Sequence, residues 1–381
     1  MKKVQRKFNP TIFIKNTKQT IASNKLMTVL GLLIIGVVLV VTAVVWSGSD
    51  AQKSKTTLPS TTLTDSCEKS ATITYSCYKN QLNSITYSEG PSKAVKLVKT
   101  QFEKIPFVKA QCHQLVHVIG RAAYDKYDDL GKTFVEGDHF CASGYFHGAS
   151  EEIVVKKGPA YFSKNANKVC SVFVDRSRYK EVDHYNCVHG LGHGILEAED
   201  QELFKALSVC DLLSGIWQQQ SCYSGVFMQN IMIAQGSDAV APNKSKYLKP
   251  EDPMYPCTAV DNKYMSGCYI IQSSYALSVS SYDFAKVFSL CADVADSYNR
   301  IVCYQSVGRD ASGGGNNLEE TKKRCLIAVS TEAQINCIIG AAKDIVYSFH
   351  SDKEAMGFCQ SLPEHLLDVC QNNAKSYYST F

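Results

Sequence analysis

The sequence predicts an all-α protein in which disulfide-linked helical hairpins stack into an α-solenoid-like array after one N-terminal transmembrane helix. Three observations predict this class: a charge-free apolar run near the N-terminus, an internal repeat of 34 residues, and sixteen cysteines that all follow the apolar run. The 381 residues are 45% hydrophobic and 20% charged, which is a globular composition and excludes disorder throughout.

The N-terminal region predicts a membrane anchor. Residues 1–25 carry seven basic side chains and no acidic one, and residues 26–46 form a run of 21 residues without a charge. Such a run matches the roughly 30 Å hydrocarbon core of a bilayer, and it exceeds the apolar region of about 7–15 residues in a cleavable signal peptide. Basic residues stay on the cytoplasmic side of a membrane. We therefore expect a single-pass membrane protein with a cytoplasmic tail, residues 1–25, and an extracytoplasmic C-terminal part.

Three segments are expected after the anchor. Residues 47–66 are almost all small or polar and predict a flexible stalk. Residues 67–199 predict a helical domain rich in histidine and cysteine, and residues 200–381 predict a set of helical repeats. Without the seven basic residues of the tail, 33 basic side chains face 36 acidic ones, so a nucleic-acid partner is not expected.

The cysteine spacing defines the repeat. Four cysteines (257, 291, 325 and 359) are 34 residues apart, and each is followed by a second cysteine 11 or 12 positions later. Segments such as Asp283–Cys291 precede the first cysteine with apolar residues at helical spacing, and a new helix is expected to start at each second cysteine. Each unit is thus helix, turn, helix, with a disulfide between the two helices. The C-x2-C knuckles of thiolate zinc sites are absent.

The same spacing assigns all sixteen cysteines to eight disulfides in an oxidising compartment. Six pairs close short loops, a seventh closes a longer turn, and the eighth follows by elimination. In that order they are Cys67–Cys77, Cys210–Cys222, Cys257–Cys268, Cys291–Cys303, Cys325–Cys337 and Cys359–Cys370, then Cys170–Cys187, then Cys112–Cys141. A short-loop bond of this kind stabilises a fold by about 3 kcal/mol.

The 34-residue period resembles that of tetratricopeptide-like repeats, and the paired cysteines resemble the disulfide-stapled helical repeats of some secreted bacterial proteins. The resemblance covers about residues 200–381, although the tetratricopeptide signature of Trp, Gly and Pro is missing. It implies a superhelix whose second helices line one surface. Such families usually bind partners, so the resemblance implies a protein or an envelope polymer on the repeat surface.

Histidines concentrate in the first half of this region. Seven of the nine lie between positions 113 and 193, and five closely follow a cysteine that is expected to open a helix. These five are His113, His117, His147, His189 and His193. The pairs 113/117 and 189/193 have i, i+4 spacing, which puts both imidazoles on one helical face, as in metal-binding H-x3-H pairs. If successive second helices stack, His117, His147 and His193 are expected to converge.

Carboxylates continue the same helical faces, because Glu151 and Glu197 are each four residues after a histidine of the group. Imidazole with carboxylate is a ligand set for transition metals, and zinc, iron and copper all remain open. Nearby glycines, including Gly148 and Gly190, are expected to let helices approach closely at a helix-propensity cost of about 1 kcal/mol each. If the site is catalytic, Glu151 and Glu197 are the candidates for ligand or general base, and whether the protein is an enzyme stays open.

Two alternatives stand beside this metal-binding hypothesis. The histidines could line a metal-free catalytic or ligand pocket, or they could be structural residues of a surface scaffold that binds a partner along the repeats. His139 and His184 precede their cysteines and are expected either to hydrogen-bond the metal ligands or to lie on the surface, and His350 and His365 lie outside the cluster. The motifs of covalent haem, zinc proteases, P-loops, dinucleotide folds and serine hydrolases are absent.

Overall fold

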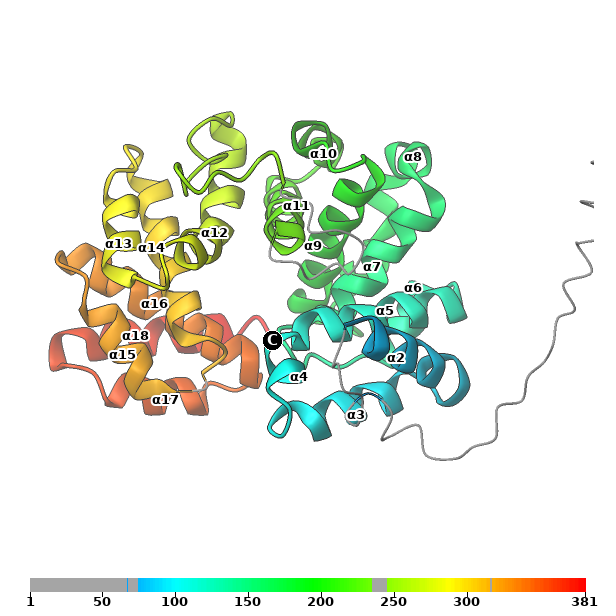
Figure 1. Cartoon of the computed structure of the whole chain (residues 1–381), viewed down its shortest axis with the longest axis horizontal. Helices are drawn as coiled ribbons and strands as arrows, with labels where there is room; N and C mark the ends of the chain where they lie inside the picture. Colours follow the sequence, from blue (N-terminus) through cyan, green and yellow to red (C-terminus); the bar gives the residue numbers. More distant parts are fainter. Residues whose placement is uncertain (1–66, 68–74, 235–244, 316) are drawn as a thin grey trace, which may run out of the picture. The chain divides into compact units, whose positions relative to one another are not determined.

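Helices build the part of the chain that the structure, a computed structural model, describes: residue 67 and residues 75–234, 245–315 and 317–381 (Figure 1). These residues belong to one unit, residues 62–381. No β-strand occurs among them, and their only sheet-like pairing is one isolated bridge between Lys249 and Asp252. The predicted all-α class is confirmed for this part of the chain.

The helices up to residue 234 are α2 (Tyr75–Glu89), α3 (Pro91–Phe102), α4 (Pro106–Ala110), α5 (Cys112–Tyr127), α6 (Leu130–Val135), α7 (Gly144–Lys157), α8 (Pro159–Val169), the 3-10 helix η2 (Ser171–Val174), α9 (Glu181–Ala198), α10 (Leu203–Cys210) and α11 (Ile216–Ala234). Three of them begin with a proline, at positions 91, 106 and 159. Proline suits the first helical turn because its fixed φ is already helical and its missing N–H would have no partner there.

The later helices are α12 (Asn262–Val279), α13 (Phe284–Ala292), α14 (Ser297–Ser312), α15 (Leu318–Leu326), α16 (Thr331–Phe349), α17 (Lys353–Gln360) and α18 (Glu364–Tyr378). Long helices pack on one another in chain order, α5 on α7, then α9, α11, α12, α14, α16 and α18. Shorter helices such as α10, α13, α15 and α17 pack on the long helices that precede and follow them. The stack therefore consists of the predicted hairpins, and its long helices form a continuous row (Figure 1).

All sixteen cysteines are paired, in the eight combinations that the spacing predicts. The expectation that each second helix starts at its second cysteine is wrong for the later repeats. Helix α14 starts at Ser297, six residues before Cys303, because the Asp296 side chain accepts a hydrogen bond from the Asn299 amide and caps the helix there. Ser330 caps α16 in the same way.

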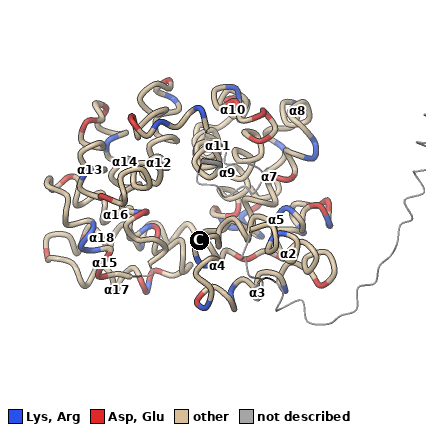
Figure 2. Tube along the Cα trace, in the orientation of Figure 1, with Lys and Arg blue, Asp and Glu red and all other residues tan. Residues whose placement is uncertain are grey.

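Apolar side chains along the row of long helices form the core. Leu115 and Ile119 of α5 and Leu191 of α9 are fully buried, and they belong to one cluster that extends through Phe227 to Leu366 near the C-terminus. Truncating a buried leucine or isoleucine to alanine costs about 2–5 kcal/mol. Acidic and basic residues are interspersed along the helices (Figure 2).

Glycines set the spacing between the helices that carry the histidines. A Cβ atom added to Gly148 of α7 would lie 2.2 Å from the carbonyl oxygen of His117 on α5. A Cβ atom added to Gly190 of α9 would lie 2.7 Å from the carbonyl oxygen of His147 on α7. Only a residue without a side chain fits at such distances. The predicted close approach is confirmed, and it brings histidines from three helices side by side.

The described residues contain no helix that is both long and apolar enough to cross a membrane. The two helices of 19 residues differ from a membrane span in their polar content: α16 includes Glu332, Lys343 and Asp344, and α11 includes glutamines and serines among its apolar residues. They bury one apolar side in the protein and keep polar groups on another. This finding contradicts the predicted single-pass membrane location. The predicted tail, span and stalk, residues 1–66, lie outside the described residues.

Candidate metal centre

Five imidazole rings form one cluster at the centre of the α5, α7 and α9 row. Helix α5 contributes His113 and His117, α7 contributes His147, and α9 contributes His189 and His193. The His147 ring is the central one, because its centroid lies 5.4, 5.6, 4.7 and 5.7 Å from those of the other four, in chain order. His113 is half-buried and the other four are at most 5% exposed.

Two groups of three histidines have ring nitrogens close enough to share a metal ion. In the first group, His113, His117 and His147 offer nitrogens that lie within 4.8 Å of one another, and His147, His189 and His193 do the same in the second. The expected trio of His117, His147 and His193 also has adjacent rings, with the 117 and 193 centroids 5.1 Å apart. The closer groups differ from that trio because each i, i+4 pair on one helix turns both Nε2 atoms toward each other.

Hydrogen bonds fix the tautomers of the α5 pair. The His113 Nδ1 atom lies 2.9 Å from the Cys141 carbonyl oxygen, and the His117 Nδ1 atom lies 3.2 Å from Glu151 Oε2. A carbonyl and a carboxylate only accept hydrogen bonds, so both Nδ1 atoms donate. A neutral imidazole carries one ring hydrogen, which leaves both Nε2 atoms bare. These two bare nitrogens lie 3.1 Å apart.

The α9 pair repeats this pattern with partners from α11. His193 Nδ1 lies 2.8 Å from Gln229 Oε1, and His189 Nδ1 lies 2.9 Å from the Ser224 hydroxyl oxygen. The Ser224 hydroxyl donates its own hydrogen to the Ser221 carbonyl, so it accepts from His189. The Nε2 atoms of the pair lie 3.2 Å apart.

The spacing of both pairs matches metal coordination. Metal–nitrogen bonds of about 2.0–2.1 Å in tetrahedral geometry separate two ligand nitrogens by about 3.3 Å. Without a cation or a proton between them, two nitrogen lone pairs at 3.1 Å repel. A proton is disfavoured because burial, and then the neighbouring His117, lower the pKa of His113 to about 3. The arrangement therefore fits a metal cation between neutral imidazoles.

His147 differs from the two pairs, because its Nδ1 atom rather than its Nε2 atom is bare. Its Nε2 atom lies 3.3 Å from Asn186 Oδ1, which also accepts a hydrogen bond of 2.8 Å from the Tyr347 hydroxyl on α16. The His147 Nδ1 atom is buried without a hydrogen-bond partner. Burial, followed by the neighbouring His189, lowers the pKa of His147 well below its usual value. The bare Nδ1 atom is thus the nitrogen available to a metal.

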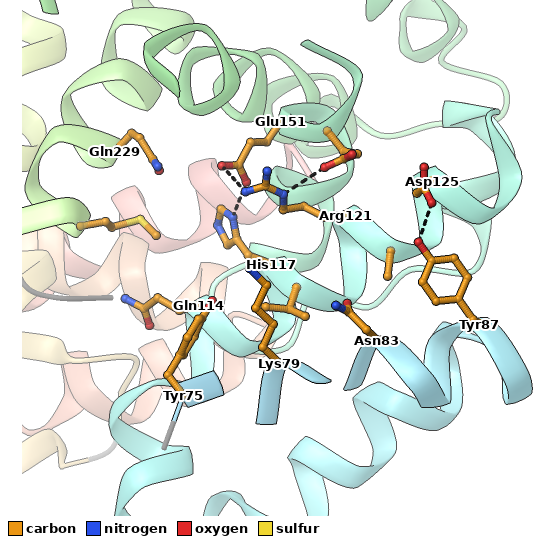
Figure 3. Close-up of a pocket in the computed structure, with 14 residues that line it drawn as sticks. Tyr75, Lys79, Asn83, Tyr87, Gln114, His117, Arg121, Asp125, Glu151 and Gln229 are labelled. Carbon is orange, nitrogen blue, oxygen red and sulfur yellow. Dashed lines mark hydrogen bonds and ion pairs between the residues drawn. The ribbon is translucent and has the colours of Figure 1, made fainter. Parts of the chain in front are cut away.

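The two candidate carboxylates, Glu151 and Glu197, both bind Arg121 beside the histidine groups. Figure 3 shows Glu151 between Arg121 and His117. Glu151 accepts from His117 through Oε2 and from Arg121 through Oε1 at 3.3 Å, and Glu197 binds Arg121 through both oxygens at 3.1 Å. Glu152 accepts from the Arg121 Nε atom at 3.0 Å. Three carboxylates share one guanidinium, so carboxylates outnumber cations beside the histidines, which favours a bound cation. Burial, and then Glu151, raise the pKa of Glu197.

Pockets reach the cluster from two sides. A pocket of about 350 Å³ is lined by His117, Glu151 and Arg121, and side chains of α2 such as Lys79 and Asn83 close its opposite side (Figure 3). A second pocket of about 210 Å³ is lined by His113, His147 and His189 together with residues of α12, α14, α16 and α18. An ion or a small molecule could therefore contact the imidazoles from either side.

The other described histidines stay outside the two groups. His139 bonds the Ser143 hydroxyl at 3.1 Å, and its ring lies 4.1 Å from that of His350. His184 is buried and packs on Trp217 at 5.1 Å. His365 is exposed on α18.

Several residues that complete the cluster are not among the sequence-based candidates: Arg121, Asn186, Ser224, Gln229 and Tyr347. Ser224 has a sequence signal, because it stands two residues after Cys222 just as His189 stands two residues after Cys187. The Tyr347 contact has none, since 161 residues separate it from Asn186.

Comparisons with protein-family models, curated proteins and solved structures find no match to this chain. The tetratricopeptide-like resemblance therefore stays a prediction. By its fold and disulfides, the described part is a disulfide-linked, all-helical repeat protein with a buried histidine cluster.

Proposed function

We propose that this protein binds a transition-metal ion through His113, His117, His147, His189 and His193. The observation that carries the proposal is the pair of close Nε2 contacts, 3.1 and 3.2 Å, in which each Nδ1 atom is held by an oxygen acceptor. Oxygen acceptors behind metal-bound imidazoles fix the ring orientation and raise the basicity of the ligating nitrogen. Structural histidines would need no such matched pairs of bare nitrogens.

The ligand chemistry favours zinc, copper or iron. Neutral imidazole suits these ions, whereas magnesium and calcium prefer oxygen ligands. Among divalent ions at a nitrogen site, copper binds most tightly in the general affinity order, and availability rather than affinity selects the metal in a cell.

We infer one ion per chain. His147 is a member of both groups of three, and its Nδ1 atom is the ring nitrogen without a hydrogen-bond partner, since Nε2 lies on Asn186. One lone pair binds one ion, so only one group is complete at a time. Three protein ligands leave a coordination position for water or another molecule, as catalytic zinc sites do. We assign no general base, because both oxygens of Glu151 and of Glu197 already accept hydrogen bonds.

Cobalt titration and elemental analysis test the proposal. The purified chain is stripped with a chelator, titrated with Co²⁺ while the visible d–d absorption is recorded, and then analysed after loading with zinc or copper. We expect one equivalent of metal, lost in His147→Ala and retained in His365→Ala, whose imidazole is exposed and distant from the cluster in sequence. A folded chain that binds no metal at about micromolar concentration would instead support structural histidines.

A further inference from the structure

The second pocket, of about 210 Å³ and here called the inner pocket, faces the histidine cluster from the later repeats. His147 and His189 line one side of it, and Gln305 of α14, Lys343 of α16 and Tyr377 of α18 line the other. The proposed metal binding makes no use of these later residues. A buried ligand nitrogen without a partner, His147 Nδ1, belongs to a side chain that borders this space.

Lys343 is a cation without a carboxylate partner among the described residues. It is half-buried, and its hydrogen bond goes to the Gln305 amide oxygen at 3.3 Å. Burial alone lowers its pKa. Arg309, in the same pocket, is by contrast neutralised by Asp310 at 2.7 Å. A partly buried ammonium without a counter-charge is costly unless an anion compensates it.

Asp344, which follows Lys343 in the sequence, also lines the pocket, but its carboxylate does not pair with Lys343. It accepts a hydrogen bond of 2.9 Å from the Gly314 amide. Burial raises its pKa to about 6, so it is a weaker counter-charge than an ordinary aspartate. Lys343 is left as the group that can hold an anion from outside the chain.

Apolar side chains form much of the remaining lining of the pocket. Met228, Ile270 and Ile271 line it together with the rings of Tyr185 and Tyr377. The volume of the pocket is about 210 Å³. Drug-sized ligands occupy pockets of about 300–1,000 Å³, so the occupant is smaller than these.

We propose that the inner pocket binds a small organic monoanion, an aromatic or aliphatic carboxylate, with its carboxylate on Lys343 and its apolar body between Ile270, Ile271 and the histidines. One unpaired ammonium matches a single negative charge better than a phosphate dianion. This placement brings the ligand beside the open position of the metal, and that last step alone rests on the proposed metal binding.

The test uses the full chain, both metal-free and loaded with Co²⁺. Benzoate and hexanoate are titrated by calorimetry, with benzamide and hexanamide as neutral analogues and inorganic phosphate as an anion without an apolar body. Lys343→Met keeps the apolar stem and removes the charge, and Lys353→Met at an exposed position is the matched control. Thermal melts of each variant verify folding.

We expect at least one carboxylate to bind the wild type and Lys353→Met, and Lys343→Met to weaken it by about 10- to 100-fold, as loss of a charge-assisted hydrogen bond does. The neutral amides should bind the wild type more weakly than the carboxylates do, by a similar factor. The inference is overturned if neither carboxylate binds at about 10 mM, if Lys343→Met binds as wild type does, or if phosphate binds as well as the carboxylates.

The two proposals fail separately. If the chain takes up no Co²⁺ and still binds a carboxylate in a Lys343-dependent way, the metal site is refuted and the anion pocket stands. Metal binding with no carboxylate bound would refute the anion pocket alone. When both hold, the carboxylate should change the Co²⁺ absorption, because its body lies beside the metal.

Discussion

The shared position of His147 gives the sharpest prediction. His147→Ala leaves each group with two histidines, whereas His113→Ala leaves His147, His189 and His193 intact and His189→Ala leaves His113, His117 and His147 intact. We therefore expect His147→Ala to lose most of the metal affinity. The single changes at His113 and His189 should be mild, and the two together should behave like His147→Ala.

The magnitude follows from ligand counting. Removing a residue that only orients a ligand costs about 10- to 100-fold in metal affinity, so loss of a ligand shared by both groups should exceed about 100-fold. If the two groups bind equally well, losing one of them removes half of the binding arrangements and weakens affinity by about twofold, or roughly 0.4 kcal/mol.

The assay is a competition titration of each variant against a chromogenic chelator, with Co²⁺ absorption as the second readout. His184→Ala is the matched control, because His184 is also buried on α9 but packs on Trp217 outside the cluster. His147→Gln fills more of the space than alanine and tests whether any loss comes from misfolding. Wild-type affinity in a folded His147→Ala chain, or equal losses at all five histidines, would refute the shared-ligand reasoning.

Three further predictions concern the scaffold. Gly148→Ala should lower both the melting temperature and the metal affinity, since the new Cβ meets the His117 carbonyl and overpacking costs about 1–3 kcal/mol. Gly357→Ala in α17 is the matched control. A Cβ atom added there has no neighbouring atom within 4 Å, so this change should stabilise the fold by up to about 1 kcal/mol. Burial and then His350 lower the pKa of His139 to about 3. The unfolded chain takes up this proton near pH 6.5, so His139 alone should lower the stability between about pH 6.5 and 3 by up to about 1.4 kcal/mol per pH unit. Thermal melts of His139→Asn should therefore show a shallower pH dependence than those of the wild type. Replacing both Cys325 and Cys337 by alanine should cost about 2–4 kcal/mol in denaturant titrations and leave metal affinity unchanged. An unaltered melt of Gly148→Ala, a parallel pH profile of His139→Asn, or a metal loss in the cysteine variant would each contradict the stated cause.

The sequence alone determined the features that depend on local spacing. Cysteine spacing predicted the hairpin disulfides, since a bond that closes a helical hairpin requires a nearly fixed separation along the chain, and Cys112–Cys141 followed by elimination. The i, i+4 histidines and the nearby glycines predicted the cluster, because one helical turn puts such residues on one face. The predicted start of α14 at Cys303 was wrong, because the Asp296 side chain caps the helix and starts it at Ser297. The membrane location, inferred from the apolar run, is contradicted by the described helices.

Only the tertiary structure decided how the cluster is held and what faces it. Arg121 binds three glutamates from two other helices, Asn186 accepts from Tyr347 161 residues away, and Lys343 reaches the inner pocket from α16. None of these contacts has a fixed sequence spacing. They depend on the angle and distance at which whole helices pack, which result from the sum of many weak side-chain contacts and from the glycine crossings between α5, α7 and α9.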